Sequence, residues 1–149
     1  GPGVESRLVM ALVKASGAVI FRQTDSNLEF LIVESRLRAG SWGLVKGKIE
    51  EGETEYQAAQ REIVEEVGLS SLIFLTGFRE EVRYTLPSGD EKVVVYFLSE
   101  AHELEITLQE EELSDYRWIS YPIICKTLSF PDTCRVVKNA VSYLDRICP

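Results

Sequence analysis

The sequence of 149 residues contains few of the side chains that build soft-metal sites and nucleophilic triads. It has one histidine, His102, and three cysteines, none of which stand in a CxxC pair. These shortages disfavour a zinc site of the Cys and His type and a Ser-His-Asp triad. The cysteines Cys125, Cys134 and Cys148 are odd in number, and we interpret them as reduced structural residues of a cytoplasmic protein.

Long apolar runs and an excess of positive charge are also missing. No stretch is apolar over enough residues to span a membrane, and we expect neither a signal peptide nor a membrane partner. The net charge of −8 disfavours a nucleic-acid-binding surface, which is usually basic, so no stable nucleic-acid binding is expected. The same charge would repel a polyphosphate unless cations and local Lys or Arg side chains screen it.

The length and the composition are typical of one globular domain. With 45% hydrophobic residues, the chain can bury a core of ordinary size. The first three residues, Gly-Pro-Gly, look like the remnant of a cleaved expression tag. We therefore expect residues 1–9 to be a tag remnant, Met10 to be a plausible native start, and residues 10–149 to form one monomeric domain.

The periodicity of the apolar residues predicts strands, a helix, further strands and a second helix. Strands are expected over residues 15–22, 28–34, 72–86, 91–101 and 116–120, with a short extended segment at 42–45 and turns at 25–27 and 87–90. Helices are expected over residues 55–67 and from Pro131 onward, and a helical turn is expected within 122–128. This order predicts a layered α/β or α+β fold.

The most informative stretch is residues 47–69, which read GKIEEGETEYQAAQREIVEEVGL. Glu62, Glu65 and Glu66 stand at i, i+3 and i+4, so their carboxylates share one face of a helix. Like charges at this spacing repel, and a divalent cation would offset the repulsion. Carboxylates without His or Cys select hard cations, so we expect Mg²⁺ or Mn²⁺. The alternative is a solvated acidic helix face.

The helix that carries these glutamates has clear start and stop signals. Thr54 and Gln57 predict a capping box at its beginning. Gly68 predicts a left-handed residue at its end. Arg61 lies four residues before Glu65 and could orient that carboxylate.

This stretch resembles the Nudix box, whose pattern is G, five residues, E, seven residues, then R-E-U-x-E-E-x-G-U with U aliphatic. All nine specified positions are filled, by Gly47, Glu53, Arg61, Glu62, Ile63, Glu65, Glu66, Gly68 and Leu69. The resemblance implies an α/β/α sandwich with a mixed sheet and a loop–helix–loop motif. It also implies hydrolysis of a phosphoanhydride bond in a nucleoside diphosphate linked to another group. The implied catalytic residues are Glu53, Arg61, Glu62, Glu65 and Glu66.

The resemblance extends the metal site beyond the three helix glutamates, which are themselves implied ligands. The family often takes a further carboxylate from a loop before a Trp-containing strand, and Glu112 stands six residues before Trp118. Glu110 and Glu111 are the alternatives, as is a loop that is simply solvated. The carbonyl at the position of Lys46 can complete the coordination of a metal. Which glutamate is the general base stays open.

Other segments are similar to the asymmetrical diadenosine tetraphosphate hydrolases, which form ATP and AMP. The similarity covers residues 28–33, 78–84, 92–98 and 116–118, with Trp42 and the pair Lys46-Gly47. The candidate substrate-binding residues are Trp42, Lys46, Lys48, Tyr84, Lys92 and Phe130. Arg36, Arg38 and Lys48 are further candidates for phosphate contact, and surface charge is the alternative for each. Core packing is the alternative for Trp42.

The sequence also departs from this subfamily near the box. Those enzymes typically have His residues beside the Trp and a Pro-Pro before Lys-Gly, whereas this chain has Gly40, Ser41, Leu44 and Val45 there. Lys48 stands where a His is common. The alternative substrates are ADP-ribose, nucleotide sugars, mRNA cap and diphosphoinositol polyphosphates. A non-catalytic Nudix-fold binding module and an unrelated acidic interaction domain are the alternatives from other classes.

Overall fold

The computed structural model describes residues 11–102 and 105–148. The expected tag remnant at residues 1–9 and the proposed start at Met10 lie outside these residues. Within them no helix combines the length and the apolar character needed to cross a membrane.

The described residues form eight strands and three helices. The strands are β1 (Leu12–Gln23), β2 (Leu28–Ser35), β3 (Trp42–Gly43), β4 (Val45–Lys48), β5 (Leu72–Phe74), β6 (Glu80–Thr85), β7 (Glu91–Ala101) and β8 (Leu113–Ser120). The helices are α2 (Glu55–Val67), α3 (Ile124–Thr127) and α4 (Pro131–Ile147). The expected order of strands, helix, strands and helix is therefore confirmed.

The strands form one mixed sheet. Its main path runs β3-β2-β1-β7-β5, while β4 also pairs with β1, β6 with β7, and β8 with β2. The central pair β1 and β7 is parallel, from Leu12 opposite Glu91 to Phe21 opposite Glu100, and the other pairs are antiparallel. Because β1 and β7 are far apart in the sequence, their pairing brings the box region beside the second half of the chain.

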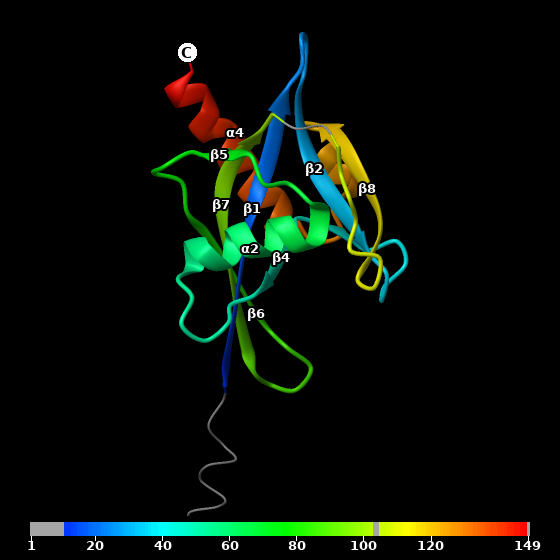
Figure 1. Cartoon of the computed structure of the whole chain (residues 1–149), viewed down its shortest axis with the longest axis vertical. Coiled ribbons are helices and arrows are strands. Elements are labelled where there is room, and N and C mark those ends of the chain that lie inside the picture. Colours follow the sequence, from blue (N-terminus) through cyan, green and yellow to red (C-terminus); the bar gives the residue numbers. More distant parts are fainter. Residues whose placement is uncertain (1–10, 103–104, 149) are drawn as a thin grey trace, which may run out of the picture.

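Helices cover both faces of this sheet, as Figure 1 shows, with α2 in front of the strands and α4 behind them. Ile63 and Val67 of α2 pack with Ile20 and Leu31 in one buried cluster. α4 packs against the opposite face in a second cluster that includes Val19, Val94, Val136, Val137 and Ala140. The apolar stripes of the two amphipathic helices thus make the outer layers of the expected α/β/α arrangement.

The expected long strand over residues 72–86 is wrong in one respect, because it is two strands, β5 and β6. Gly77 lies between them with φ 95°, in the left-handed region that a strand does not use. A Cβ at Gly77 would lie 2.9 Å from the hydroxyl oxygen of Tyr143 on α4. That hydroxyl donates to the carbonyl of Thr76 at 2.5 Å, so contact with α4 stabilises the break.

The prediction of three reduced cysteines is also wrong. Cys125 in α3 and Cys134 in α4 form a disulfide, and only Cys148 carries a thiol, which is exposed. The two residues are nine positions apart, and the turn between α3 and α4 brings their Cα atoms to 5.1 Å. A spacing pattern alone did not reveal this proximity, since it depends on how the two helices meet.

Candidate active site

The helix α2 is held in register by both of its ends. The Gln57 N–H donates to Thr54 Oγ1 at 3.1 Å, and the Thr54 N–H donates to Gln57 Oε1 at 3.0 Å. Gly68 ends the helix with φ 72°, and its N–H donates to the carbonyl of Val64. The predicted capping box and left-handed stop are therefore present. They determine which side chains of α2 face the sheet and which face the loop before it.

The loop before α2 approaches the helix closely at one glycine. A Cβ built on Gly47 would lie 2.0 Å from the Cδ and Oε2 atoms of Glu62. A second glycine allows β1 to approach the same region closely. A Cβ on Gly17 of β1 would lie 1.9 Å from the carbonyl oxygen of Val45. Both approaches need a residue without a side chain. They place the main chain of Lys46 and Gly47 against the buried carboxylate of Glu62.

The guanidinium of Arg61 ties this loop to the helix. It donates to both carboxylate oxygens of Glu53, at 2.7 and 2.9 Å, and to the carbonyl of Lys48 at 2.9 Å. It also donates to Glu62 at 2.8 Å and to the expected partner Glu65 at 3.0 Å. The hydrogen bonds from Arg61 lower the pKa of Glu53 to about 2. Glu53 and Arg61 therefore hold the loop–helix geometry as a two-pronged ion pair.

Three carboxylates interact around the inner face of α2. Burial raises the pKa of Glu66 to about 8, and the charges of Glu62 and Glu112 raise it further. Burial also raises the pKa of Glu62, to which the charges of Glu65 and Glu112 contribute while Arg61 opposes the shift. When these carboxylates are ionised they repel one another, and a bound divalent cation would offset that repulsion.

The donor set fits a hard divalent cation, since it consists of carboxylate oxygens and main-chain carbonyls. Within residues 11–102 and 105–148, no three carboxylate, histidine or cysteine side chains already stand together in a metal-holding arrangement. Glu65 is half exposed and, like Glu62, turns an oxygen toward Arg61. The charge of Glu112 nonetheless raises the pKa of both Glu62 and Glu66, so the three carboxylates lie in one region.

The loop that carries Glu112 is attached to the end of α2. The Gln109 N–H donates to the carbonyl of Glu66 at 2.9 Å, and the Thr107 N–H donates to that of Val67 at 3.0 Å. These two bonds satisfy carbonyls that a helix leaves unpaired at its last turn. Of the three consecutive glutamates at 110–112, only Glu112 affects the pKa values of Glu62 and Glu66. This supports Glu112 over its two neighbours as the carboxylate nearest the helix.

A cationic cluster adjoins these carboxylates. Burial lowers the pKa of the Lys46 ammonium, and the neighbouring charge of Lys92 lowers it further. Tyr84 lies opposite Lys92 in the β6–β7 pairing, with the Lys92 Nζ 5.9 Å from the centre of its ring. Two lysines beside an acidic site can bind the phosphates of a substrate.

Sequence reasoning missed Tyr96 at this place. Its side chain is buried, and its pKa is raised by burial and then by the charges of Tyr84 and Glu66. It stands four residues after Lys92 on β7. Side chains four apart on a strand share a face, so the alternation of β7 was a signal that could have found it.

Of the remaining candidate residues, Trp42 and Phe130 lie on the side of the sheet that α4 covers. The Trp42 ring is buried beneath the guanidinium of Arg117, whose Cζ lies 4.5 Å from the ring centre. Trp42 and Ser129 exchange two hydrogen bonds, at 2.8 and 3.1 Å, through the N–H and the carbonyl of Trp42. Phe130, which follows, is 51% exposed. Lys48 is exposed at the end of β4.

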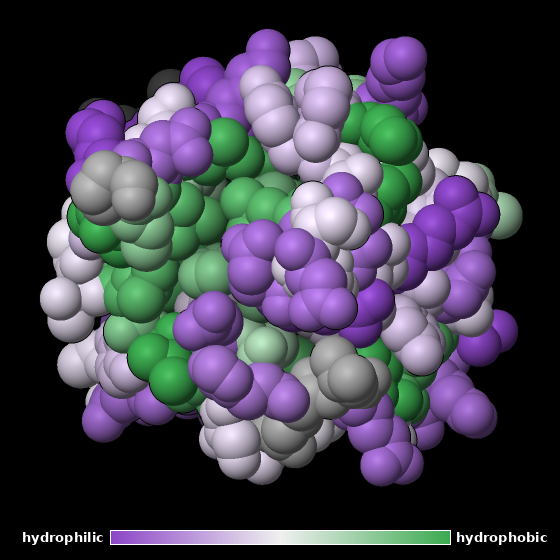
Figure 2. All heavy atoms as spheres, turned by 90° about the horizontal axis from the view of Figure 1, so that it is seen from above, coloured by the Kyte–Doolittle hydropathy of each residue, from purple (hydrophilic) through white to green (hydrophobic). Residues whose placement is uncertain are grey.

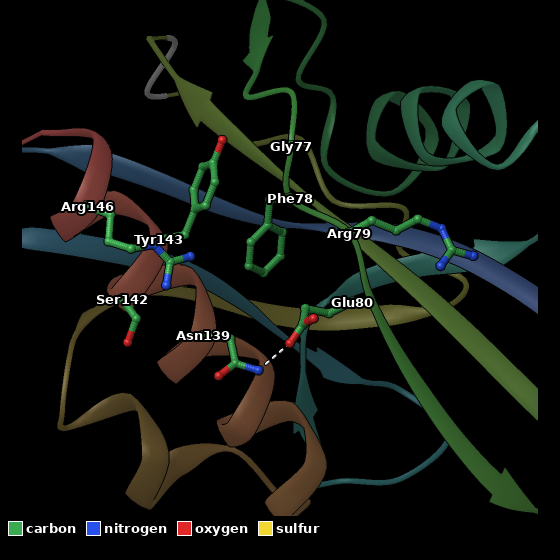
Figure 3. Close-up of a pocket in the computed structure, with 8 residues that line it drawn as sticks. All are labelled: Gly77, Phe78, Arg79, Glu80, Asn139, Ser142, Tyr143 and Arg146. Atoms are coloured by element: carbon green, nitrogen blue, oxygen red, sulfur yellow. Dashed lines mark hydrogen bonds between the residues drawn. The ribbon is translucent and has the colours of Figure 1, made fainter.

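Two hollows lie away from the carboxylates. One of about 220 Å³ is formed by α4 and the segment before β6, and Figure 3 shows Asn139 pointing at Glu80, to which it donates a hydrogen bond. The other, of about 390 Å³, is lined by aromatic residues including Tyr56, Phe74 and Phe97. Figure 2 shows apolar side chains gathered in a hollow of the face that it displays. Neither hollow is lined by Glu62, Glu66 or Glu112.

Comparison with known proteins agrees with this geometry. Residues 12–132 match the model of the NUDIX domain. The asymmetrical bis(5'-nucleosyl)-tetraphosphatase of Sus scrofa is 32% identical over 145 residues, which cover 91% of this chain and 97% of that protein. A crystal structure of a C. elegans Ap4A hydrolase binary complex superposes with a TM-score of 0.83 at 26% identity, over 89% of this chain and 98% of that one.

A more distant structure extends the likeness in fold alone. The NUDIX domain of Shewanella oneidensis NrtR complexed with ADP ribose superposes with a TM-score of 0.72 at 22% identity, over 94% of this chain and 92% of that chain. The predicted sandwich with a mixed sheet and a loop–helix–loop motif is confirmed by these matches. The prediction of a Nudix hydrolase is confirmed as well, and the chain belongs to the NUDIX domain family.

Proposed function

We propose that this chain is a metal-dependent hydrolase of nucleoside polyphosphates, and that its preferred substrate is diadenosine tetraphosphate, split asymmetrically to ATP and AMP. The observation that carries the proposal is that a group of carboxylates lies beside a pair of lysines. The carboxylates of Glu62, Glu66 and Glu112 adjoin the ammonium groups of Lys46 and Lys92. A polyphosphate bound through cations needs both a negative region and a positive one.

The negative region would hold Mg²⁺ or Mn²⁺. The residues that would hold it are Glu62, Glu66 and Glu112, with the carbonyl of Lys46 and with Glu65 at the rim. When bound, such a cation neutralises charge on phosphate oxygens and lowers the pKa of a water. Arg61 and Glu53 keep Glu62 in place through the ion pair described above. One of the glutamates would accept the proton of the attacking water.

The positive region would hold the phosphates that the cations do not reach. Lys46 is half-buried and already destabilised by its neighbour Lys92, so an anion that approaches both relieves their repulsion. Tyr84 is 39% exposed and Phe130 is 51% exposed, and rings with a free face can stack on a base. The chain would therefore bind phosphates centrally and bases at its ends.

Sequence relatives support the same substrate. The porcine relative is called an asymmetrical bis(5'-nucleosyl)-tetraphosphatase, and the match extends over nearly the whole of both chains. The missing histidines beside Trp42 and the presence of Lys48 are differences near the box. They bear on the choice of substrate rather than on the carboxylate chemistry. A single domain over residues 10–149, a monomer and a cytoplasmic location are also part of this proposal.

A substrate panel tests the proposal. Wild-type protein would be incubated with diadenosine tetraphosphate, ADP-ribose, a nucleotide sugar, capped RNA and a diphosphoinositol polyphosphate, each with Mg²⁺ and with EDTA. Chromatography should show ATP and AMP from the first substrate only when Mg²⁺ is present, with the highest kcat/KM. A higher kcat/KM for another member of the panel would overturn the substrate while leaving the hydrolase. Absence of any turnover would favour a non-catalytic Nudix-fold module.

A further inference from the structure

Arg36 lies directly after β2, and its side chain contacts the loop that carries Glu112. Its main-chain N–H donates to the carbonyl of Glu112 at 2.8 Å. Its guanidinium donates to the carbonyl of Glu110 through Nε and to that of Leu113 through Nη2, at 3.4 Å for the latter. Three carbonyls on both sides of the Glu112 side chain thus converge on one residue.

The backbone at this place is arranged for that contact. The pairing of β2 with β8 shifts register between Glu34 and Ser35, so Glu34 faces Asp115 whereas Ser35 faces Leu113. The unpaired Ser114 donates from its hydroxyl to Glu34 at 2.8 Å. Such a bulge bends a strand and redirects the residues next to it. It brings the residue after β2 beside the peptide groups that flank Glu112.

We propose that Arg36 is a positioning residue that holds the Glu112 carboxylate toward Glu62 and Glu66. The inference rests on the proposed function, because it assumes that Glu112 is a metal ligand. The guanidinium, fixed by the carbonyls of Glu110 and Leu113, also places a positive charge that offsets the repulsion among the consecutive glutamates at 110–112. The guanidinium donors that make these bonds are directed at the loop, which argues against the earlier expectation that Arg36 contacts a phosphate.

The first test compares Arg36→Ala, Arg36→Lys and the neighbouring control Leu37→Ala, since Leu37 is exposed in the same loop. Groups that orient metal ligands typically affect metal affinity or activity by about 10-fold to 100-fold. Arg36→Ala should lower kcat about tenfold with an unchanged KM, and it should weaken Mn²⁺ binding, measured calorimetrically without substrate, by a similar factor. Arg36→Lys should restore part of both losses, because it keeps the charge but not the forked donors.

The second test is a double-mutant cycle with Glu112→Gln. If Arg36 acts through Glu112, Arg36→Ala should cost little more in the Glu112→Gln background, in kcat and in Mn²⁺ affinity. Equal losses in both backgrounds would overturn the proposal, as would a raised KM with unchanged kcat, which indicates phosphate contact. A loss of equal size in Leu37→Ala would also overturn it. Should Arg36→Ala fail to fold, Arg36→Lys carries the same cycle.

The two proposals fail in different ways. Absence of metal-dependent turnover by the wild-type protein on the whole panel would refute the proposed function. The Mn²⁺ cycle would still decide the role of Arg36, because it needs no substrate. Conversely, wild-type kcat and Mn²⁺ affinity in Glu112→Gln would overturn the role of Arg36 and leave the hydrolase intact.

Discussion

The carboxylate of Glu62 rests on the Cα atom of Gly47, so closely that a Cβ there would lie 2.0 Å from it. The obstructed atoms are the far end of a flexible side chain rather than backbone. An added methyl group would therefore displace Glu62 instead of forcing the loop and the helix apart. The glycine at the start of the box thus controls where a candidate metal ligand lies.

Gly47→Ala should consequently reduce activity far more than stability. A small displacement of a catalytic group can cost about 10²-fold in rate, so we expect kcat to fall by roughly that factor. The melting temperature should change little. Gly43→Ala is the matched control, because a Cβ at Gly43 meets no atom within 4 Å. Steady-state kinetics and thermal unfolding check both variants, and a large loss of stability with normal kcat in Gly47→Ala would contradict the expectation.

Glu66→Gln should lower activity but raise the stability of the metal-free protein. Loss of this charge should lower kcat by about two decades or more. Burial raises the folded-state pKa of Glu66 to about 8, above its unfolded value near 4.5, so the folded protein favours the protonated form. The metal-free wild-type protein should therefore lose stability as the pH rises from about 4.5 to 8.

Glu66→Gln has no such group, and in EDTA its melting temperature should exceed that of the wild type increasingly over this range. The measurement is thermal unfolding of both proteins at several pH values. Parallel melting curves for the two proteins across the whole range would show that Glu66 does not titrate as described.

Glu53→Gln should show the reverse dependence on pH. The hydrogen bonds from Arg61 lower the folded-state pKa of Glu53 to about 2, below its unfolded value near 4.5. The stabilisation by this carboxylate is complete above about pH 4.5 and is lost as the pH falls toward 2. The wild type should therefore be more stable than Glu53→Gln at neutral pH, and the two should converge in acid. Glu51→Gln in the same loop is the control, and a constant difference down to pH 2 would speak against the ion pair.

Tyr84→Ala should raise KM more than it lowers kcat, because stacking on a base is equal in the ground state and the transition state. The loss in kcat/KM should correspond to about 1–3 kcal/mol for a stacked base. Tyr84→Phe keeps the ring and should retain a KM near the wild-type value. If Tyr84 instead serves only to pack the β6–β7 hairpin, Tyr84→Ala will lower the melting temperature and leave KM unchanged.

Lys92→Ala should affect long polyphosphates more than ADP-ribose. Lys92 and Lys46 together form the cationic region next to the carboxylates, and a longer phosphate chain needs more compensation for its charge. The measurement is kcat/KM for diadenosine tetraphosphate and for ADP-ribose in the same variant. Equal losses for both substrates would show that Lys92 does not read the length of the chain.

Reduction of the Cys125–Cys134 disulfide should weaken substrate binding and lower stability. The closed segment contains Ser129 and Phe130, and its opening releases the loop that presents the Phe130 ring. A crosslink of this short separation contributes about 2–4 kcal/mol in the chain-entropy description. Dithiothreitol should therefore raise KM and lower the melting temperature of the wild type. The double variant Cys125→Ser/Cys134→Ser should no longer respond to dithiothreitol, and a wild type that is equally unresponsive would contradict the prediction.

The parts of the structure that the sequence predicted are those determined locally. The helix expected over residues 55–67 is found as Glu55–Val67, because its capping box, apolar stripe and terminal glycine all act within a few residues. The contact between Arg61 and Glu65 is local for the same reason. The box motif then predicted the family and the acidic face.

The remaining features depend on contacts between distant segments. The parallel pairing of β1 with β7 places Lys92 and Tyr96 near the box, and no periodicity within β7 specifies that neighbour. The break at Gly77 and the disulfide depend on how α4 lies against the rest of the chain. The preference for Glu112 over Glu110 and Glu111 likewise depends on the contact between this loop and the end of α2, which the sequence does not show.

The peptide group of Glu66 joins the two halves of the candidate metal site. Its side chain belongs to the helix, while its carbonyl accepts the N–H of Gln109 from the loop that carries Glu112. Because of this hydrogen bond, a displacement of the end of α2 would carry the loop with it, and the gap between the carboxylates of Glu66 and Glu112 would change less than if helix and loop were unconnected. The hydrogen bond between helix and loop thus limits changes in the spacing of the two carboxylates, which is the spacing that a bound cation would need.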